Sequence, residues 1–492
     1  MLDKRFSRRY FFYGTLLAGA IPRGGFSSTP SLKFLGFKSP NEKLNIAAIG
    51  AGGRAETNLP GVESENLVAF ADPDSNRAAN YFSWYEKAPK YADFRKMLDK
   101  EGNNIDAVVV TTPDHIHAVA ALWCMERGKH VYVEKPLTHT VTEARLLKAA
   151  AAKYKVATQM GNQGYSNNGA RIAAEIIWSG EIGDVTEVHA WTNRPIWPQG
   201  INKLPAEEKV PATLDWDVWL GPAKTRPYSS EYLPFNWRGW FDFGCGALGD
   251  IACHVLGAPN IALRLGAPTS VEVVSQEGKN SLTFPKRSRI VFQFPARRAM
   301  PPVKIFWYDG VEEDRVYKPA GISDSEPLFG GPGSFGAGGG FDTGPTRGGA
   351  AAAQPAPVPA PAQKTTTRSP YIDPGGAVFV GTKGFLTADT YAANIRLLPE
   401  SRHNEYTLPP QILTRSPGHY RDWIRACKGG DPACSNFNVA APFTEWVLLG
   451  SLALHFDGKL EWDGEKMKFT NNAKANELLA TTYRKGWELP KV

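Results

Sequence analysis

The stretch that decides the fold is LNIAAIGAGGRA, residues 44–55, in which a short apolar strand runs into a G-x-G-x-x-A turn. The first glycine, Gly50, permits the tight turn, and Gly52 lets the backbone approach a pyrophosphate. Ala55 lets the following helix pack closely on the strand. Because glycines also occur in ordinary strand–helix turns, the turn alone is a weak signal, and the neighbouring segments decide its meaning.

The neighbouring segments indicate a parallel, doubly wound sheet. Four further apolar runs alternate with helical stretches as far as residue 162, and they read NLVAFAD, IDAVVVTTP, HVYVEKP and VATQMGN. Asp72 ends the second run, where its carboxylate would accept hydrogen bonds from an adenosine ribose. A carboxylate there would repel a 2′-phosphate, which favours NAD over NADP, although Arg77 leaves NADP open.

Two of these strands end in polar residues at the edge that holds the glycine turn. One continues as TTPDHIH, residues 111–117, and the other as VEKP, residues 133–136. Lys135 could form a surface ion pair with Glu134, but the following proline, which can be cis, favours a lysine directed at a ligand. His117 could equally be a helix residue that packs on the sheet.

After residue 180 the pattern changes to strands joined by turns. The runs are VTEVHAWT, TSVEVVSQ, RIVFQFP, VKIFWYD, AVFVGTKG and GFLTAD, and they predict a mostly antiparallel open sheet. Helices are expected at 443–456, which is apolar nearly all round, and at 475–489. The fold class is therefore α/β, with a Rossmann domain over residues 43–165 and an α+β domain over residues 166–492.

Residues 328–369 are rich in Gly, Ala and Pro. Such a segment cannot bury enough apolar surface to offset its ordering entropy. We expect a disordered insertion in a surface loop of the second domain.

The first 42 residues predict an export signal followed by a linker. Arg8 and Arg9 precede a short apolar run that ends in A-x-A, as in twin-arginine signals; a basic, disordered tail is the alternative. The run is too short to span a bilayer, which needs about 20 residues. The protein is expected to be exported, to the periplasm for example, with no stable membrane insertion after removal of the signal.

Charge and cysteines exclude several classes of protein. The net charge of +7 is spread over 492 residues without a basic run, which argues against nucleic-acid binding. Five cysteines without a C-x-x-C pair argue against a disulfide framework or a zinc site. Cys427 and Cys434 could pair or remain free thiols.

A further motif, GALGDIACH at residues 246–254, would place Asp250 and His254 on one face of a helix, at positions i and i+4. This spacing also suits a metal or a structural hydrogen bond. No third ligand accompanies the pair, so no metal site is predicted.

Together, GAGGRA, Asp72, TTPDHIH, VEKP and GALGDIACH resemble, in this order, the glucose-fructose oxidoreductase and inositol dehydrogenase family (Gfo/Idh/MocA). The resemblance implies NAD as cofactor, a sugar or cyclitol substrate, and a homo-oligomer formed through the open sheet. It implies that Lys135 is catalytic, that Asp250 and His254 complete the site, and that Asn162 lies near the nicotinamide. The expected cofactor residues are Gly50, Gly52, Gly53, Arg54, Asp72, Thr112, Pro113, His117, Glu134, Lys135 and Asn162, and the expected substrate residues are Tyr165, Arg238, Asp250 and His254.

The expected chemistry is the oxidation of a sugar, glycoside or cyclitol hydroxyl. His254, titrating near neutral pH and oriented by Asp250, would take the hydroxyl proton, and Lys135 would stabilise the developing alkoxide. Because free NAD is scarce outside the cytoplasm, an exported enzyme would keep its cofactor bound. Two alternatives stay open: a glycosidase that oxidises its sugar transiently, and a binding protein without activity.

Overall fold

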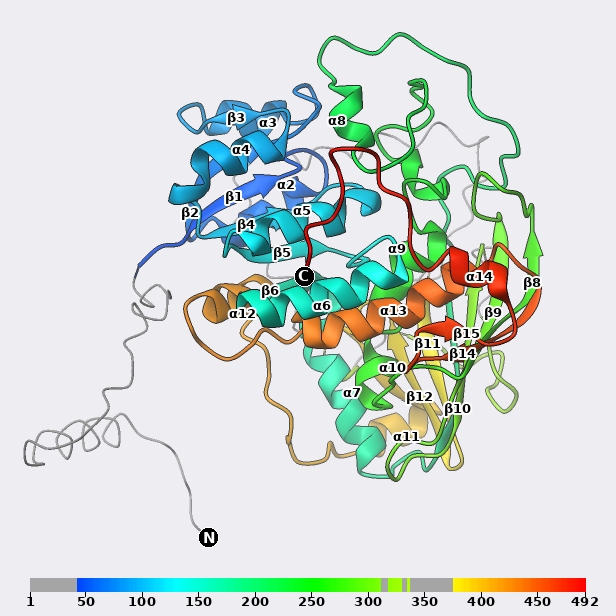
Figure 1. Cartoon of the computed structure of the whole chain (residues 1–492). Coiled ribbons are helices and arrows are strands. Elements are labelled where there is room, and N and C mark those ends of the chain that lie inside the picture. Colours follow the sequence, from blue (N-terminus) through cyan, green and yellow to red (C-terminus); the bar gives the residue numbers. More distant parts are fainter. Residues whose placement is uncertain (1–41, 311–316, 330–333, 337–374) are drawn as a thin grey trace, which may run out of the picture.

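The computed structural model describes residues 42–310, 317–329, 334–336 and 375–492. The expected export signal and residues 330–333 and 337–369 of the expected insertion lie outside this part of the chain. Two sheets lie side by side, the N-terminal one with the blue and cyan elements and the second with the green and yellow ones (Figure 1). The red C-terminal tail runs back over the first domain, so both ends of the described chain contribute to it.

The first domain is a six-stranded parallel sheet in the order β3-β2-β1-β4-β5-β6. All five predicted strands are present, and β4 (AVVV) and β5 (HVYVE) are buried on both faces, as is typical of strands in a parallel sheet. The sixth strand, β3, has two residues, too few for a recognisable pattern. The strands are β1 (Asn45–Ile49), β2 (Asn66–Ala71), β3 (Lys90–Tyr91), β4 (Ala107–Val110), β5 (His130–Glu134) and β6 (Thr158–Gly161).

Helices connect these strands, and short polar caps determine where two of them begin. Thr140 and Glu143 form a reciprocal capping box at the start of α6, and Asp93 accepts from the main chain at the start of α4. The helices are α2 (Ala55–Asn58), α3 (Ala79–Trp84), α4 (Phe94–Glu101), α5 (Asp114–Glu126) and α6 (Val141–Tyr154).

The second domain is a nine-stranded sheet in the order β13-β12-β11-β7-β10-β9-β8-β14-β15. Only β7 and β10 pair in parallel, which confirms the mostly antiparallel prediction. The predicted strands are β7 (Val185–Thr192), β8 (Ser270–Glu277), β9 (Arg287–Phe294), β10 (Val303–Asp309), β11 (Gly375–Gly381) and β12 (Gly384–Asp389). Three others were not predicted: β13 (Ile395–Leu398), β14 (Gly458–Asp463) and β15 (Lys468–Phe469).

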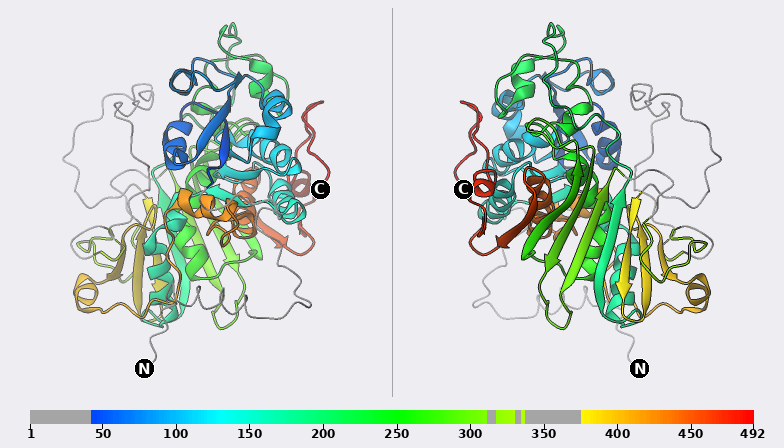
Figure 2. Two further views of the ribbon diagram at one scale, coloured as in Figure 1. Left: turned by 90° about the vertical axis from the view of Figure 1, so that its left-hand side faces the viewer. Right: turned by 90° about the vertical axis from the view of Figure 1, so that its right-hand side faces the viewer.

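Helices pack on one face of this sheet, as the side views in Figure 2 show. Among the helices in contact with its strands are α7 (Asn168–Trp178), α9 (Gly246–Val255) and α13 (Phe437–Ala453), and α10 (Gly257–Ala262) packs on α7. The opposite face carries Trp191 and Tyr308, against which residues 317–329 pack. Phe329 lies 5.4 Å from the Trp191 ring, and Thr387 donates to the carbonyl of Leu328. Leu328 and Phe329, which the predicted insertion includes, are therefore buried.

The C-terminal third of the chain completes the first domain. Tyr420 and Trp423 of α12 (His419–Cys427) pack with Ile46 and Val109 on one face of the parallel sheet. The predicted boundary at residue 165 therefore leaves out a helix that belongs to the first core.

The predicted helix over 475–489 is wrong. Helix α14 covers only Ala473–Glu477, and the rest of the tail reaches across the first domain. Its contacts are specific: Tyr483 donates to Glu143, and Trp487 packs on Phe94 with the Arg95 guanidinium 3.7 Å from its ring. These tertiary contacts hold the tail in its non-helical conformation. Among the described helices, none is long and apolar enough for a membrane span.

Candidate active site

Neighbouring protein atoms lie so close to the glycine turn that side chains would not fit there. Gly50 has a positive φ of 83°, and a Cβ there would lie 2.9 Å from the main chain of Thr111. A Cβ at Gly52 would lie 2.2 Å from the carbonyl oxygen of Arg77, whose guanidinium extends along Gly53. Arg77 thus lies on the turn itself, where it can meet a phosphate.

Asp72 stands at the end of β2, but it binds the glycine turn as well. Its Oδ2 accepts from the amides of Ala51 at 2.8 Å and Gly52 at 3.2 Å, and its Oδ1 accepts from Asp74. Burial raises the pKa of Asp72 to about 6, against the effect of these hydrogen bonds. A carboxylate has about four acceptor positions, so about one remains for a ribose hydroxyl.

Three buried polar atoms have no hydrogen-bond partner within the described chain: Thr112 Oγ1 and Asn162 Nδ2, which follow β4 and β6, and His254 Nδ1 on α9. Unpartnered buried donors and acceptors are costly and rare in folded proteins. All three belong to the residues predicted to hold cofactor or substrate. The residues at this edge therefore fit a dinucleotide with a polar nicotinamide end.

The orientation of Asn162 follows from a residue far along the chain. Ser435 donates from Oγ to Asn162 Oδ1 at 2.7 Å, while its own amide donates to Gln159 Oε1 at 3.0 Å. This bond occupies the carbonyl of the carboxamide and leaves its NH₂ group without a partner. Sequence analysis missed Ser435, because no motif around it predicts a contact with Asn162.

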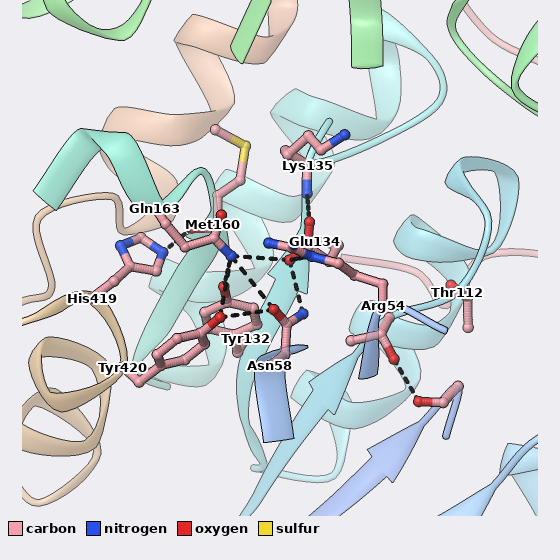
Figure 3. A network of polar contacts seen from close by, with 12 residues as sticks. Arg54, Asn58, Thr112, Tyr132, Glu134, Lys135, Met160, Gln163, His419 and Tyr420 are labelled. Carbon is pink, nitrogen blue, oxygen red and sulfur yellow. Dashed lines mark hydrogen bonds and ion pairs between the residues drawn. The ribbon is translucent and has the colours of Figure 1, made fainter. Parts of the chain in front are cut away.

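Glu134 lies at the centre of a buried polar network (Figure 3). Its Oε1 accepts from Arg54 Nε, Asn58 Nδ2 and Gln163 Nε2 at 3.1, 2.8 and 3.2 Å. Tyr420 donates to Asn58 Oδ1 at 2.8 Å, which connects α12 to the network. Burial alone would raise the pKa of Glu134, but Arg54 and Lys135 hold it at about 2. Glu134 is thus a fixed anion that supports the glycine-turn helix. Its side chain forms its ion pair with Arg54 rather than with Lys135.

Lys135 reaches across to the second domain. Its Nζ donates to the main-chain carbonyl and to Oδ1 of Asp250 at 2.7 and 2.8 Å, and Arg238 Nε donates to the same Oδ1 at 3.1 Å. Burial opposes ionisation of Asp250, but Lys135, Arg238 and Arg194 hold its pKa well below the usual range. The Lys135–Pro136 bond is cis. The surface ion pair between Lys135 and Glu134 that the sequence left open is not formed.

His254 is 5% exposed and lies one helical turn beyond Asp250 on α9. Burial, with Lys135 and Arg54 nearby, lowers the pKa of His254 to about 3, so the imidazole is neutral over the physiological range. The expectation that it titrates near neutral pH is therefore wrong. Asp250 contacts Lys135 and Arg238 instead of His254, so it does not orient the imidazole by a hydrogen bond; the Tyr391 ring packs edge-on at 4.8 Å.

His117 and Tyr165, two other predicted site residues, are held in place by contacts within the protein. His117 lies 2.7 Å from the carbonyl of Pro136 and 2.9 Å from that of Thr112, so it ties the ends of two strands together. Tyr165 is buried, accepts from Asn260 Nδ2 at 3.1 Å and packs on Phe443. These contacts show how each ring is held.

The described residues contain neither a metal-binding cluster nor a disulfide. Within the described residues, no group of three or more His, Cys, Asp or Glu side chains is arranged to hold a metal. All five cysteines are free thiols, so Cys427 and Cys434 do not pair.

Three features together define a dinucleotide-dependent α/β protein. They are a parallel sheet with a glycine turn, an acidic residue after the second strand, and a lysine–aspartate pair between the two domains. The chain belongs to the Gfo/Idh/MocA oxidoreductase family. Residues 44–162 match the family's NAD-binding Rossmann fold, and residues 179–293 match its C-terminal alpha/beta domain. The first domain is therefore an NAD-binding Rossmann domain.

Individual relatives are distant. A glycosyl hydrolase family 109 protein of Solibacter usitatus is 28% identical over 34% of this chain and 41% of its own length. A levoglucosan dehydrogenase of Pseudarthrobacter phenanthrenivorans is 26% identical over 44% and 50%. The chain thus spans about half the length of these curated relatives or less. The WlbA dehydrogenase of Bordetella pertussis, solved with NADH and UDP-GlcNAcA, shares the fold at 14% identity, with a TM-score of 0.54 over 86% of this chain and 99% of its own.

Proposed function

We propose that the protein is an NAD-dependent oxidoreductase that moves a hydride between a sugar, glycoside or cyclitol hydroxyl and a tightly bound nicotinamide cofactor. The observation that carries this proposal is the Lys135–Asp250 pair, which lies at the same sheet edge as the glycine turn and one helical turn from the unpartnered His254 Nδ1. The levoglucosan dehydrogenase relative supports a sugar-type substrate.

In this proposal, Lys135, His254 and Asp250 have different roles in the reaction. Bound NAD would supply the acceptor for the hydride that leaves the carbon carrying the hydroxyl. Lys135 Nζ hydrogen-bonds the hydroxyl oxygen and stabilises its developing negative charge. The hydroxyl proton passes to His254, whose Nδ1 has no hydrogen-bond partner within the described chain. Asp250 holds the ammonium in place and remains ionised throughout.

Retention of the cofactor has support in the loop that follows Asp72. The amide of Ser75 donates to the carbonyl of Thr213 at 2.9 Å, and the amide of Asp215 donates to that of Pro73 at 2.8 Å. The second domain is therefore attached beside the expected ribose site, which would slow release of the adenosine end. Slow release suits a protein exported with its cofactor.

A second candidate is a glycoside hydrolase that oxidises its sugar transiently, eliminates the aglycone beside the ketone and reduces the product again. The relative named as a glycosyl hydrolase favours it. The same Lys135, Asp250 and His254 would serve both candidates, because both begin by oxidising a hydroxyl.

One experiment tests both. The protein is denatured and the supernatant is assayed for nicotinamide nucleotide; the intact protein is then offered sugars, and absorbance at 340 nm is followed. Stable NADH supports the dehydrogenase, and release of nitrophenol from nitrophenyl glycosides without added NAD supports the hydrolase. Absence of nucleotide, together with no binding of added NAD(H), would overturn the proposal.

Export and assembly complete the proposal. We expect the twin-arginine pair to direct export, so replacing Arg8 and Arg9 with Lys should leave precursor in the cytoplasm. We also expect a homo-oligomer through the open sheet, measured as mass in solution. Normal export and processing of the double variant would contradict the twin-arginine signal. A monomeric mass in solution would contradict the homo-oligomer.

A further inference from the structure

Two arginines flank one tryptophan ring beside the Lys135–Asp250 pair. The guanidinium carbons of Arg194, which follows β7, and Arg238, in η4 (Asn236–Gly239), each lie 5.9 Å from the centroid of the Trp197 ring. Arg238 also contacts Asp250 directly, so this arginine pair adjoins the proposed reaction centre.

The tryptophan between them is held firmly. Trp197 is 4% exposed, and its Nε1 donates to Gln199 Oε1 at 2.8 Å. Gln199 in turn donates to the carbonyl of Pro285 at 2.6 Å. Arg238 also lies 4.2 Å from the Phe235 ring and 4.3 Å from the Trp237 ring. These contacts limit the movement of Arg238 and of the ring that both arginines share.

Positive charge exceeds negative charge here. Lys135, Arg238 and Arg194 face one ionised carboxylate, that of Asp250. Asp114 is the other carboxyl nearby, and its Oδ2 accepts from the Cys245 amide, so the three cations still outnumber the two carboxyl groups. Glu134 is already engaged by Arg54.

The arginines also have donors to spare. Within the described chain, the Arg194 guanidinium makes no hydrogen bond or ion pair, and Arg238 uses only Nε and Nη1, the latter to the carbonyl of Phe235. Guanidinium forks with free N–H groups are suited to planar carboxylates and to phosphates.

We infer that the substrate is an anionic sugar, whose carboxylate or phosphate group is bound by Arg194 and the free edge of Arg238 while its hydroxyl lies at Lys135. This inference rests on the proposed function and names the substrate class.

Calorimetry on the protein with its cofactor bound tests the inference. The probes are glucose, glucuronate and glucose 6-phosphate, and the same three forms of galactose. We expect at least one acidic form to bind about tenfold or more tightly than its neutral partner, as a hydrogen bond to a charged group typically gives. The preference should weaken as salt rises. Comparison of the two acidic forms distinguishes a uronate from a phosphate.

Variants locate the effect. Arg194→Gln should bring the ratio of neutral to acidic dissociation constants toward one, and Arg194→Lys should keep part of it. Arg127→Gln is the matched control, because Arg127 lies 4.8 Å over the Trp123 ring at the far end of α5, and it should not change the ratio.

The inference is overturned if no acidic sugar binds more tightly than its neutral partner, or if Arg194→Gln retains the full preference. These binding results are independent of turnover. If only neutral sugars reduce the bound cofactor, the proposed function stands and the inference of an anionic substrate fails. If the protein prefers acidic sugars but contains and binds no nucleotide, the inference of an anionic ligand stands and the proposed function fails.

Discussion

Lys135 Nζ binds Asp250 twice, at 2.7 Å to the main-chain carbonyl oxygen and at 2.8 Å to Oδ1. Lysine and aspartate come from different domains, since Lys135 follows β5 of the parallel sheet and Asp250 lies in α9 on the second sheet. The position of the ammonium therefore depends on how the domains pack, and a change on either side should affect catalysis.

Lys135→Met should lower kcat by about 100- to 1000-fold, the usual cost of losing one group that stabilises a developing oxyanion. The protein should still contain NAD, because the contacts of Asp72 with the glycine turn do not involve the ammonium. Steady-state kinetics and nucleotide content after denaturation measure both effects. Lys153→Met, at the last turn of α6, is the control and should behave as wild type. Loss of NAD with Lys135→Met would mean that the lysine holds the cofactor.

His254→Ala should lower kcat about 100- to 10,000-fold at every pH from 5 to 8. The loss should be uniform because the pKa of about 3 leaves the imidazole neutral throughout this range. Full pH–rate profiles of the variant and wild type provide the measurement. A wild-type rise between pH 6 and 7 that disappears in the variant would show that His254 titrates there after all.

Acid should destabilise the protein through five largely buried histidines, and the raised pKa of Asp72 and Asp309, about 6 each, offsets part of this effect. Burial lowers the pKa of five imidazoles to about 3 or 4, those of His115, His130, His254, His419 and His455. Each binds a proton near pH 6.5 when unfolded but not when folded, so the stability it contributes is present above pH 6.5 and is lost as pH falls toward 4 or 3.

The slope is about 1.4 kcal/mol per pH unit for each such group. Urea unfolding at pH 5, 6 and 7 should show this loss of free energy of unfolding. His455→Phe should reduce the slope by about 1.4 kcal/mol per pH unit, which corresponds to one proton. A free energy of unfolding that stays flat from pH 7 to 5 would contradict the prediction.

Ser435→Ala should weaken retention of NAD without unfolding the protein. Without the 2.7 Å bond to Ser435 Oγ, the Asn162 carboxamide can turn over and present its oxygen in place of its NH₂ group. The dissociation constant should rise roughly tenfold, in line with one buried hydrogen bond. Fluorescence titration with NADH measures it. Ser288→Ala, which removes a buried bond to Asp309 on the second sheet, should leave NADH affinity unchanged. Equal affinity in both variants would refute the role of Ser435.

Tyr420→Phe should reduce the free energy of unfolding by about 1–3 kcal/mol, because it leaves buried Asn58 Oδ1 without its short donor. Urea denaturation of the apo and NAD-loaded protein measures the change. Tyr85→Phe, whose hydroxyl donates to Glu63 at 3.3 Å in a half-buried position, should cost less. Equal losses would show that the network around Glu134 adds no special stability.

Much of the fold could be predicted from local sequence. The buried parallel strands are short valine-containing runs, and in the second sheet β9 and β10 alternate buried and half-buried or exposed positions as one-sided strands do. Strands β3 and β15 have two residues each, and β13 has four, so no period is visible in them. The 475–489 segment has helix-forming residues, but its contacts with Phe94, Glu143 and Arg95 override local propensity.

The sequence by itself determined the Rossmann domain, the glycine turn, the acidic residue on β2 and the chemical types at positions 135, 250 and 254, because each depends on short-range patterns. Only the tertiary structure decided what these residues contact. It paired Lys135 with Asp250 rather than Glu134, brought Ser435 to Asn162, and made His254 neutral. Partner choice and desolvation depend on residues more than a hundred positions apart that packing brings together, so local sequence carries no signal for them.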